Sequence, residues 1–191
     1  LDTLLECHAI DEVYLDSESE EIFSLARDRK CHFLRRPIEL ASNATDGNQL
    51  LLWEASQVNA GIYVQALATS PFLRSSTIDQ AIYKLISSKS FDSLFAVLEQ
   101  KLYLWDTRNK PLNYNPLKIP NSVDLEKTII ETMGLYAIER EALEKRQSRI
   151  GETPLLYGIS FLESIDINTP EDFAFAEIVY RGLGDEYHAK D

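Results

Sequence analysis

Hydrophobic and polar positions alternate along the chain with two different periods. Short apolar runs bounded by polar turns are typical of buried strands, and apolar residues repeated every three or four positions are typical of helices. The runs predict strands at 12–16, 31–34, 93–98 and 131–138 and one that ends near Leu67, and the repeats predict helices at 1–9, 19–28, about 50–55 and 77–88. Strands that alternate with helices favour a mostly parallel sheet covered by helices on both faces. The pattern therefore predicts an α/β fold.

Polar loops directly follow three of the predicted extended segments, after Asp16, Leu67 and Asp166. Right-handed crossovers bring the carboxyl ends of parallel strands to one edge of a sheet. We therefore expect these three loops to lie along one rim, and we expect the functional site at that rim.

The segment 164–168 predicts an extended stretch in which two oxygen-bearing side chains share one face. Side chains of a strand alternate between faces, so Asp166 and Asn168 project together. Thr169 and Pro170 then begin a helix with acidic residues in its first turn. A carboxylate and an amide at such a junction suit Mg²⁺, which binds through one or two carboxylates plus substrate phosphates. The alternative is that Asp166 simply caps or solvates a loop.

A second segment changes this balance, because an apolar run ends at Leu67 in a small polar turn and a helix follows. The turn 68–74 reads Ala-Thr-Ser-Pro-Phe-Leu-Arg, and apolar residues then recur at helical spacing from Ile78 to Ile86. The order strand, loop and helix is the same as the order predicted around Asp16.

Together these segments resemble the acylneuraminate and 3-deoxy-manno-octulosonate cytidylyltransferases, the CMP-sugar synthetases. Residues 13–22 and 33–42 are similar to the family's strand, helix and Arg-Pro-x-Glu-Leu-Ala segment, 68–74 to its Pro-Thr-Ser-Pro-Leu-Arg loop, and 164–172 to its Ile-Asp-Ile-Asp-Thr-Pro-Glu-Asp motif. The matches occur in the family's order and span nearly the whole chain. The resemblance implies a single Rossmann-like nucleotidyltransferase domain over 1–191, incomplete at its amino terminus, with a hairpin-containing insertion at about 101–128.

The resemblance also implies the reaction and its participants. The enzyme would activate a 2-keto acid sugar, sialic-acid-like or octulosonate-like, with CTP and release pyrophosphate, using Mg²⁺ or Mn²⁺. Asp166 would be the principal metal ligand, and Asn168 a weaker one. The implied site residues are Asp166 and Arg74 for catalysis, Arg35, Asn43, Asp46, Asn48, Thr69 and Ser70 for the nucleotide, and Gly134, Tyr136 and Arg149 for the acceptor.

Several departures from the family pattern lead us to expect a divergent member. The family's opening strand and basic phosphate loop have no counterpart, since Leu1 begins in what resembles the following helix. Leu67 stands where many relatives have Gln, and Asn168 replaces the second acid of the terminal motif, so the metal site carries one negative charge less. Two alternatives remain open: the same fold with another anionic acceptor such as a phosphonate, or a non-catalytic binding or assembly module.

Composition limits the partners and the compartment. The 191 residues include 45% hydrophobic and 26% charged residues, which indicates one folded domain. The formal net charge of -12 argues against extended contact with nucleic acid or an anionic membrane. There is neither a run of 18 apolar residues nor a signal-peptide pattern. Cys7 and Cys31 are far apart in the sequence and form no Cys-x-x-Cys motif, so we interpret them as buried thiols rather than as a disulfide or a zinc site. Free thiols are typical of a reducing compartment, and we therefore expect a cytoplasmic protein.

The segment 101–128 interrupts the regular alternation with aromatic residues and prolines. Asn109, Lys110 and Pro111 suit a hairpin turn, and the aromatic side chains around it form a surface that needs to be covered. In the family the corresponding insertion mediates dimerisation and helps to close the acceptor pocket. We therefore expect a homodimer, the alternative being a hairpin that lies on its own domain.

Overall fold

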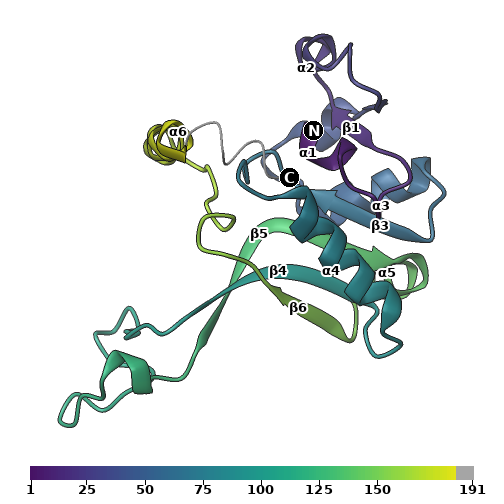
Figure 1. The fold of residues 1–191 in the computed structure, drawn as a ribbon. Helices are drawn as coiled ribbons and strands as arrows, with labels where there is room; N and C mark the ends of the chain where they lie inside the picture. The colour runs from purple at the N-terminus through teal and green to yellow at the C-terminus, as the bar shows by residue number, and fades with distance from the viewer. Residues whose placement is uncertain (184–191) are drawn as a thin grey trace.

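The structure is a computed structural model that describes residues 1–183. Its strands and helices alternate along the chain, as predicted (Figure 1). In order they are α1 (Asp2–Leu5), β1 (Tyr14–Ser17), α2 (Glu20–Leu25), β2 (His32–Arg35), α3 (Gly47–Gln57), β3 (Ile62–Ala66), α4 (Ser75–Ser87), β4 (Ser93–Gln100), β5 (Thr128–Glu139), α5 (Arg140–Arg146), β6 (Pro154–Gly158) and α6 (Pro170–Leu183), with 3-10 turns at Ile38–Ala41 and Ser122–Asp124. The sequence analysis did not predict α5 and β6.

The strands form a four-stranded sheet and a separate two-stranded pair. The sheet has the order β3-β5-β4-β6, and β1 pairs with β2 in parallel. Within the sheet β4 and β6 are parallel, whereas β5 is antiparallel to both of its neighbours, β3 and β4. Strands β3, β4 and β6 therefore run in one direction and β5 runs against them. The predicted mostly parallel α/β arrangement is confirmed, with β5 as the exception.

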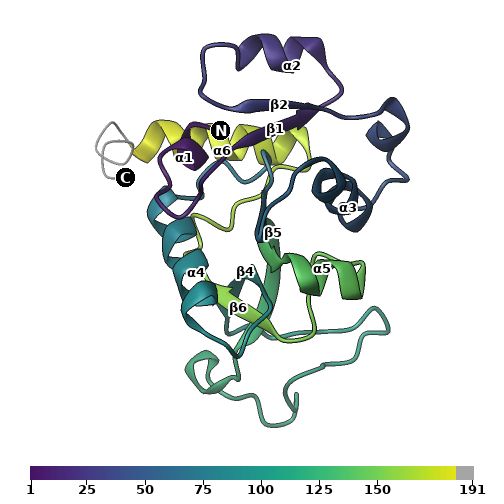
Figure 2. The ribbon, with the colours of Figure 1, turned by 90° about the vertical axis from the view of Figure 1, so that its right-hand side faces the viewer.

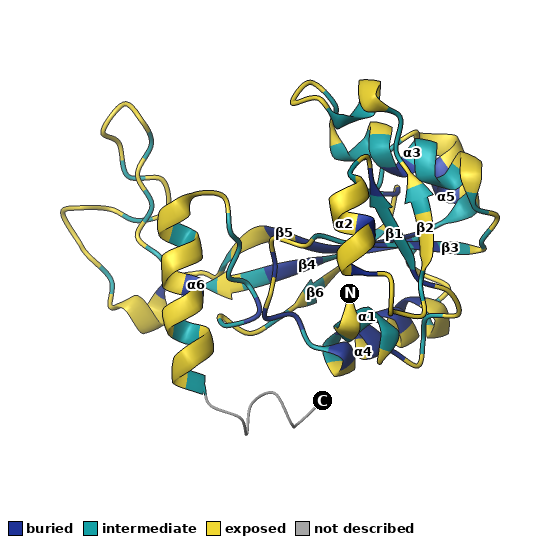
Figure 3. Cartoon of the chain, turned by 90° about the horizontal axis from the view of Figure 1, so that it is seen from above, coloured by how far each residue is buried: buried dark blue, intermediate teal, exposed yellow. Residues whose placement is uncertain are grey.

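Helices cover both faces of the four-stranded sheet, which confirms the predicted layering (Figure 3). On one face α4 contributes Ile78, Ala81, Ile82 and Leu85, which pack against Leu94, Leu135 and Ala137 in the largest buried cluster. On the other face a second buried cluster joins Leu51 of α3 and Leu143 of α5 to the sheet. Leu85 and Leu94 are both fully buried, so truncating either would cost about 2–5 kcal/mol.

Helix α1 is shorter than the predicted helix at 1–9 because a buried acid on α4 competes for its backbone. The carboxylate of Asp79 accepts hydrogen bonds from the backbone nitrogens of His8, at 3.0 Å, and Ala9, at 2.8 Å. These two N–H groups consequently leave the helical pattern, and α1 ends at Leu5. A contact between residues 70 positions apart decides this helix end.

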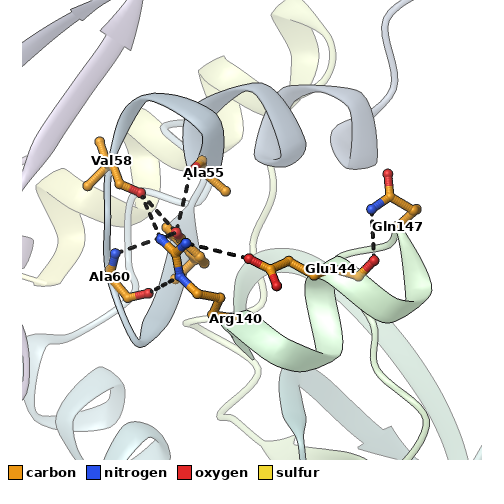
Figure 4. Close-up of polar contacts among 7 residues, drawn as sticks. Ala55, Val58, Ala60, Arg140, Glu144 and Gln147 are labelled. Carbon is orange, nitrogen blue, oxygen red and sulfur yellow. Dashed lines mark hydrogen bonds and ion pairs between the residues drawn. The ribbon is translucent and has the colours of Figure 1, made fainter.

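Arg140 at the start of α5 holds the connection between α3 and β3 (Figure 4). Its guanidinium donates to the carbonyl oxygens of Ala60, at 2.8 Å, and Val58, at 3.4 Å, and to the hydroxyl of Tyr63. Tyr63 in turn donates to Val58 at 2.8 Å. Because these contacts satisfy the backbone where α3 ends, they set how α3 lies against the sheet.

Two parts of the chain extend from this body. The segment 101–127, called the arm below, leaves the sheet between β4 and β5, and α6 is set apart from the sheet (Figure 1). The β1–β2 pair and α2 are stacked together at another end (Figure 2). Within α6 Ala176 is the one buried residue, and Phe173, Phe175, Ile178 and Tyr180 are all exposed. Within residues 1–183 no helix has the length and apolar character needed to cross a membrane.

Candidate functional site

Asp166 and Asn168 converge as predicted, although the segment that carries them is not a strand. The Asn168 side-chain amide donates to Asp166 Oδ2 at 2.7 Å. The other carboxylate oxygen, Asp166 Oδ1, is buried and has no hydrogen-bond partner within the described residues. The predicted strand at 164–168 is wrong, because the segment lies beside the loop after β3 and not beside another strand. A single backbone hydrogen bond joins the two segments, from Ile167 N to Thr69 O at 2.9 Å.

The start of α6 fixes this segment from its other side. Thr169 Oγ1 accepts from the backbone nitrogen of Asp172 at 3.2 Å, and Asp172 Oδ2 accepts from the backbone nitrogen of Thr169 at 2.8 Å. This reciprocal capping satisfies two N–H groups that a helix start leaves unpaired. Hydrogen bonds from the Thr169 side chain and from the backbone of Asn168 and Thr169 lower the pKa of Asp172. The predicted helix start at Pro170 is confirmed.

The loop after β3 packs closely against β5. Leu67 donates its backbone N–H to the carbonyl oxygen of Gly134 at 3.1 Å, and Ser70 is buried beside Gly134. A Cβ atom at position 134 would lie 2.6 Å from Ser70 Oγ. Position 134 therefore requires glycine to let the two backbones approach. Three residues from the sequence analysis, Thr69, Ser70 and Gly134, thus meet at the Asp166 segment.

Glu163 connects this loop to the turn that precedes Asp166, and the sequence analysis did not identify it as a site residue. It is 3% exposed, accepts from Ser160 Oγ at 2.7 Å, and pairs with the guanidinium of Arg74 at 3.6 Å. Burial by itself raises the pKa of Glu163, but hydrogen bonds from Thr77 and Ser160 outweigh burial, and the pKa is lowered. A single Glu in a turn has no periodic signal, because its partners are distant in the sequence.

Arg149 joins the start of α3 to β5. Its guanidinium carbon lies 3.7 Å from the centroid of the Tyr136 ring, and its Nη2 donates to Tyr136 Oη at 3.0 Å. Its backbone nitrogen donates to Asn48 Oδ1 at 2.9 Å. A Cβ atom at Gly47 would lie 2.4 Å from Arg149 Nη1, so the guanidinium crosses directly over the helix start. Asn48, Tyr136 and Arg149, assigned to nucleotide and acceptor in the sequence analysis, are therefore one cluster.

Tyr136 is held on its other side by Glu131 and Met133. Its hydroxyl donates to the carboxylate of Glu131 and contacts the sulfur of Met133 at 3.0 Å. Burial first and the Glu131 hydrogen bond second raise the pKa of the Tyr136 hydroxyl, although the charge of Arg149 acts against them. The phenol therefore stays protonated at neutral pH and remains a hydrogen-bond donor.

A chain of polar side chains continues from Arg149 into the interior. Gln65 accepts from Arg149 Nη1 at 3.5 Å and donates to Glu54 of α3 at 3.4 Å. Glu54 lies against Asp16, whose other partner is Arg36 at 2.7 Å. Burial and the hydrogen bond with Asp16 raise the pKa of Glu54 to about 7. Glu54 therefore keeps its proton to a higher pH than an ordinary glutamate. Neither Glu54 nor Gln65 was predicted, because neither belongs to a motif.

The remaining predicted nucleotide residues lie outside this cluster or have other partners. Arg35 pairs with Glu20 of α2, and its guanidinium carbon lies 5.3 Å from the centroid of the Phe23 ring. Successive strand residues face opposite ways, so Arg36 is the arginine that reaches Asp16. Asp46 caps α3 through hydrogen bonds from Asn48 N and Gln49 N, both at 2.9 Å. Asn43 is exposed in the loop before that cap.

Comparison with known proteins places this chain in a nucleotide-transferring class. The sequence model of the family described as Cytidylyltransferase matches residues 1–182. The chain belongs to the cytidylyltransferase family, and it is therefore a nucleotidyltransferase that uses CTP. The family expected from the sequence motifs is confirmed.

Two solved structures with this fold are named as synthases of different cytidine-containing products. One is a CMP-2-keto-3-deoxy-manno-octonic acid synthetase complexed with CTP, with a TM-score of 0.66 and 13% identity over 95% of this chain and 86% of that chain. The other is a 4-diphosphocytidyl-2C-methyl-D-erythritol synthase from Anaerococcus prevotii DSM 20548, with a TM-score of 0.67 and 13% identity over 94% of this chain and 83% of that chain. No curated protein sequence matches significantly. At this identity the likeness shows the fold and leaves the acceptor open.

Proposed function

We propose that this cytidylyltransferase joins the cytidylyl group of CTP to a 2-keto acid sugar, sialic-acid-like or octulosonate-like, and releases pyrophosphate. The observation that carries the acceptor class is the Arg149 guanidinium, held in place by Tyr136 and, through its backbone, by Asn48. A planar guanidinium pairs with a carboxylate through two parallel hydrogen bonds. An arginine that the fold has already oriented loses little conformational entropy on binding such an acid.

In this reaction the anomeric hydroxyl oxygen of the sugar attacks the α-phosphorus of CTP. A new oxygen–phosphorus bond forms, the bond to pyrophosphate breaks, and the hydroxyl proton is released. Such a step needs alignment and neutralisation of negative charge more than a covalent protein nucleophile. We assign to Arg74 the neutralisation of this negative charge, and we assign to Gly134, Tyr136 and Arg149 the binding of the acceptor. Arg74 directly precedes α4, in the same turn as Thr69 and Ser70, which supports its assignment.

We propose that Asp166 and Asn168 hold Mg²⁺, or Mn²⁺ in its place. The residues fit this role, because Asp166 Oδ1 is buried and no group in residues 1–183 hydrogen-bonds to it. Asn168 directs its amide nitrogen to Asp166, which leaves its amide oxygen for another partner. Residues 1–183 contain no cluster of three or more His, Cys, Asp or Glu that would bind a metal alone. Magnesium commonly takes one or two protein carboxylates and completes its shell with water and phosphate oxygens. When bound, the ion would neutralise charge on the phosphates.

The nucleotide contacts are assigned to the loops around this segment. Asn48, Thr69 and Ser70 lie beside the acceptor cluster or the Asp166 segment, which supports their assignment. Asn43 and Asp46 flank the start of α3, where Asp46 orders the loop by capping the helix. The contacts of Arg35 with Glu20 and Phe23 give its assignment no support.

We also propose a homodimer formed through the arm. Its aromatic residues are ordered among themselves: Trp105 Nε1 donates to Tyr114 Oη at 2.8 Å, and Tyr103 Oη donates to Pro120 O at 2.7 Å. Outside this small cluster the arm exposes large apolar side chains, including Leu117 at 95% and Val123 at 70%. Ordered aromatic residues beside exposed aliphatic residues are typical of a surface that another chain covers. A cytoplasmic location is part of the proposal, and it agrees with the thiol of Cys7, which donates to Thr3 O at 3.3 Å.

The experiment that tests this function is pyrophosphate release by the full-length protein with Mg²⁺, CTP and one acceptor at a time. The acceptors are N-acetylneuraminate, 3-deoxy-manno-octulosonate, a 2C-methyl-D-erythritol derivative and a phosphonate. We expect release with one of the two sugar acids and not with UTP, ATP or GTP in place of CTP. Release with the erythritol derivative or the phosphonate alone would overturn the acceptor class. The absence of release and of any CTP binding would favour a non-catalytic module.

A further inference from the structure

Glu163 is the most deeply buried acidic residue in the described part of the chain. It is 3% exposed, compared with 8% for Asp79, the other acid in the buried set. A carboxylate removed from water to this extent is costly unless hydrogen bonds and positive charge surround it. The proposed chemistry does not use this side chain, so its burial needs a separate explanation.

The partners of Glu163 come from two segments that are distant in the sequence. Within its own turn, Oε2 accepts from Ser160 Oγ at 2.7 Å and from Ser160 N at 3.3 Å. From the start of α4, Arg74 N donates to Oε1 at 3.4 Å, and Arg74 Nη2 lies 3.6 Å from Oε2. Thr77 adds a side-chain hydrogen bond. Glu163 therefore fastens the turn before Asp166 to the helix that carries Arg74.

The position of Glu163 also completes the start of α4. Arg74 is the N-cap residue of this 13-residue helix, and its own side chain makes no capping hydrogen bond. The carboxylate of Glu163 accepts the backbone N–H of Arg74 itself and a hydrogen bond from the Thr77 side chain, and the positive end of the helix dipole favours its negative charge. The turn and the helix consequently stabilise each other, and neither is set by its local sequence alone.

A second contact fixes the same segment four residues later. Ile167 donates its backbone N–H to Thr69 O at 2.9 Å. Asp166 lies between these two attachments, both of which lead to the 69–77 region. The separation between the Asp166 carboxylate and the Thr69, Ser70 and Arg74 group is therefore decided by residues 163 and 167.

We infer that Glu163 is a positioning residue of the metal–nucleotide site, a role that rests on the proposed function. It places Asp166 and Arg74 relative to each other and contacts neither the ion nor the nucleotide. Residues that orient the ligands of a metal typically change metal affinity by about 10–100-fold when they are replaced. Glu163→Gln keeps the size of the side chain but loses its charge, and its amide nitrogen cannot accept hydrogen bonds.

The test measures Mn²⁺ binding to the full-length protein in the presence of CTP. Electron paramagnetic resonance detects this binding as a loss of the signal of the free ion. We expect Glu163→Gln to weaken Mn²⁺ binding by about tenfold or more, with CTP binding in the absence of metal nearly unchanged. Glu177→Gln is the matched control, because Glu177 is exposed on α6 and pairs with Arg181 at 2.7 Å. Its affinity for Mn²⁺ should equal that of the parent. Under turnover, Glu163→Gln should lower kcat and raise the Mg²⁺ requirement without a matching rise in the KM for CTP.

Two outcomes separate this inference from the proposed function. A parent that binds neither Mn²⁺ nor CTP overturns the proposed function, and the inference with it. A parent that binds both, with a folded Glu163→Gln variant of equal Mn²⁺ affinity, overturns the inference alone. If Glu163→Gln does not fold, Ser160→Ala and Thr77→Val each remove one donor to the carboxylate and should weaken Mn²⁺ binding to a smaller extent. Parent-like affinity in both of these variants would also overturn the inference.

Discussion

The guanidinium carbon of Arg149 lies 3.7 Å from the centroid of the Tyr136 ring, and Arg149 Nη2 donates to the phenol oxygen of the same tyrosine at 3.0 Å. A cation over an aromatic face is stabilised most when water is excluded from it. The hydrogen bond from the Tyr136 hydroxyl to Glu131 fixes the orientation of the ring. The ring in turn fixes the position of the Arg149 guanidinium. The result is an oriented cation beside the start of α3.

This arrangement predicts that Arg149→Lys affects the acceptor more than the nucleotide. Lysine keeps the charge but loses the planar pair of donors and the stacking on Tyr136. We expect the KM for the acceptor to rise by about tenfold, with the KM for CTP within about twofold. Steady-state kinetics measure both constants. Arg146→Lys on the exposed end of α5 is the control, and equal effects of the two variants would contradict the assignment.

Asp166 provides the second prediction. Asp166→Ala removes the one carboxylate of the proposed metal site, so turnover of CTP should fall by about a hundredfold or more. Pyrophosphate release in the full-length protein, titrated with Mg²⁺ and with Mn²⁺, measures the loss. Glu171→Ala serves as the control, because this acid lies in the first turn of the same helix. A variant with the parent's rate and metal dependence would remove Asp166 from the site.

Glu54 predicts an unusual dependence of stability on pH. Its pKa is raised to about 7 in the folded protein from an ordinary value of 4.5, so the folded state holds a proton that the unfolded state releases. The stabilisation is complete below pH 4.5 and is lost as the pH rises through 7.

Glu54→Gln should therefore raise the melting temperature relative to the parent at pH 8 and give no comparable gain at pH 5. Glutamine stays neutral at both values and donates to Asp16 as the protonated acid does. Acids with lowered pKa values, such as Asp92 and Asp172, contribute less to the stability of the folded protein at low pH. This change is the same in parent and variant, so it cancels when their melting temperatures are subtracted. Calorimetry from pH 5 to 8 measures the effect, with the exposed Glu141→Gln as control. Parallel curves for parent and variant would show that folding does not raise the pKa of Glu54.

The arm carries the fourth prediction. Trp105 is half exposed and is the donor in the hydrogen bond that orders the arm's aromatic cluster. Trp105→Ala should weaken self-association by about 2 kcal/mol if the arm forms the dimer. Light scattering across a dilution series measures it, with Arg108→Ala at the hairpin turn as control. A mass near 21.8 kDa per particle at every concentration, for parent and variant alike, would show that the arm makes no dimer.

Local sequence determined the features that depend on neighbouring residues. The apolar repeat of α4 predicted the face that packs on the sheet, and Thr169 with Pro170 predicted where α6 begins. The close approach of Asp166 and Asn168 also followed from their separation of two residues. The order of the motifs along the chain also predicted the family, which the family model over residues 1–182 confirms.

Tertiary structure decided the features whose partners are distant along the chain. Asp79 ended α1, Glu163 joined a turn to the start of α4, and burial beside Asp16 raised the pKa of Glu54. Asp166 and Asn168 came together as expected, but Ser164 belongs to a turn and residues 165–168 formed no strand, since strand formation requires a neighbouring strand with a matching row of hydrogen bonds. A pattern in the sequence describes what a segment favours on its own, whereas burial, pairing and protonation depend on which other segment the fold places beside it.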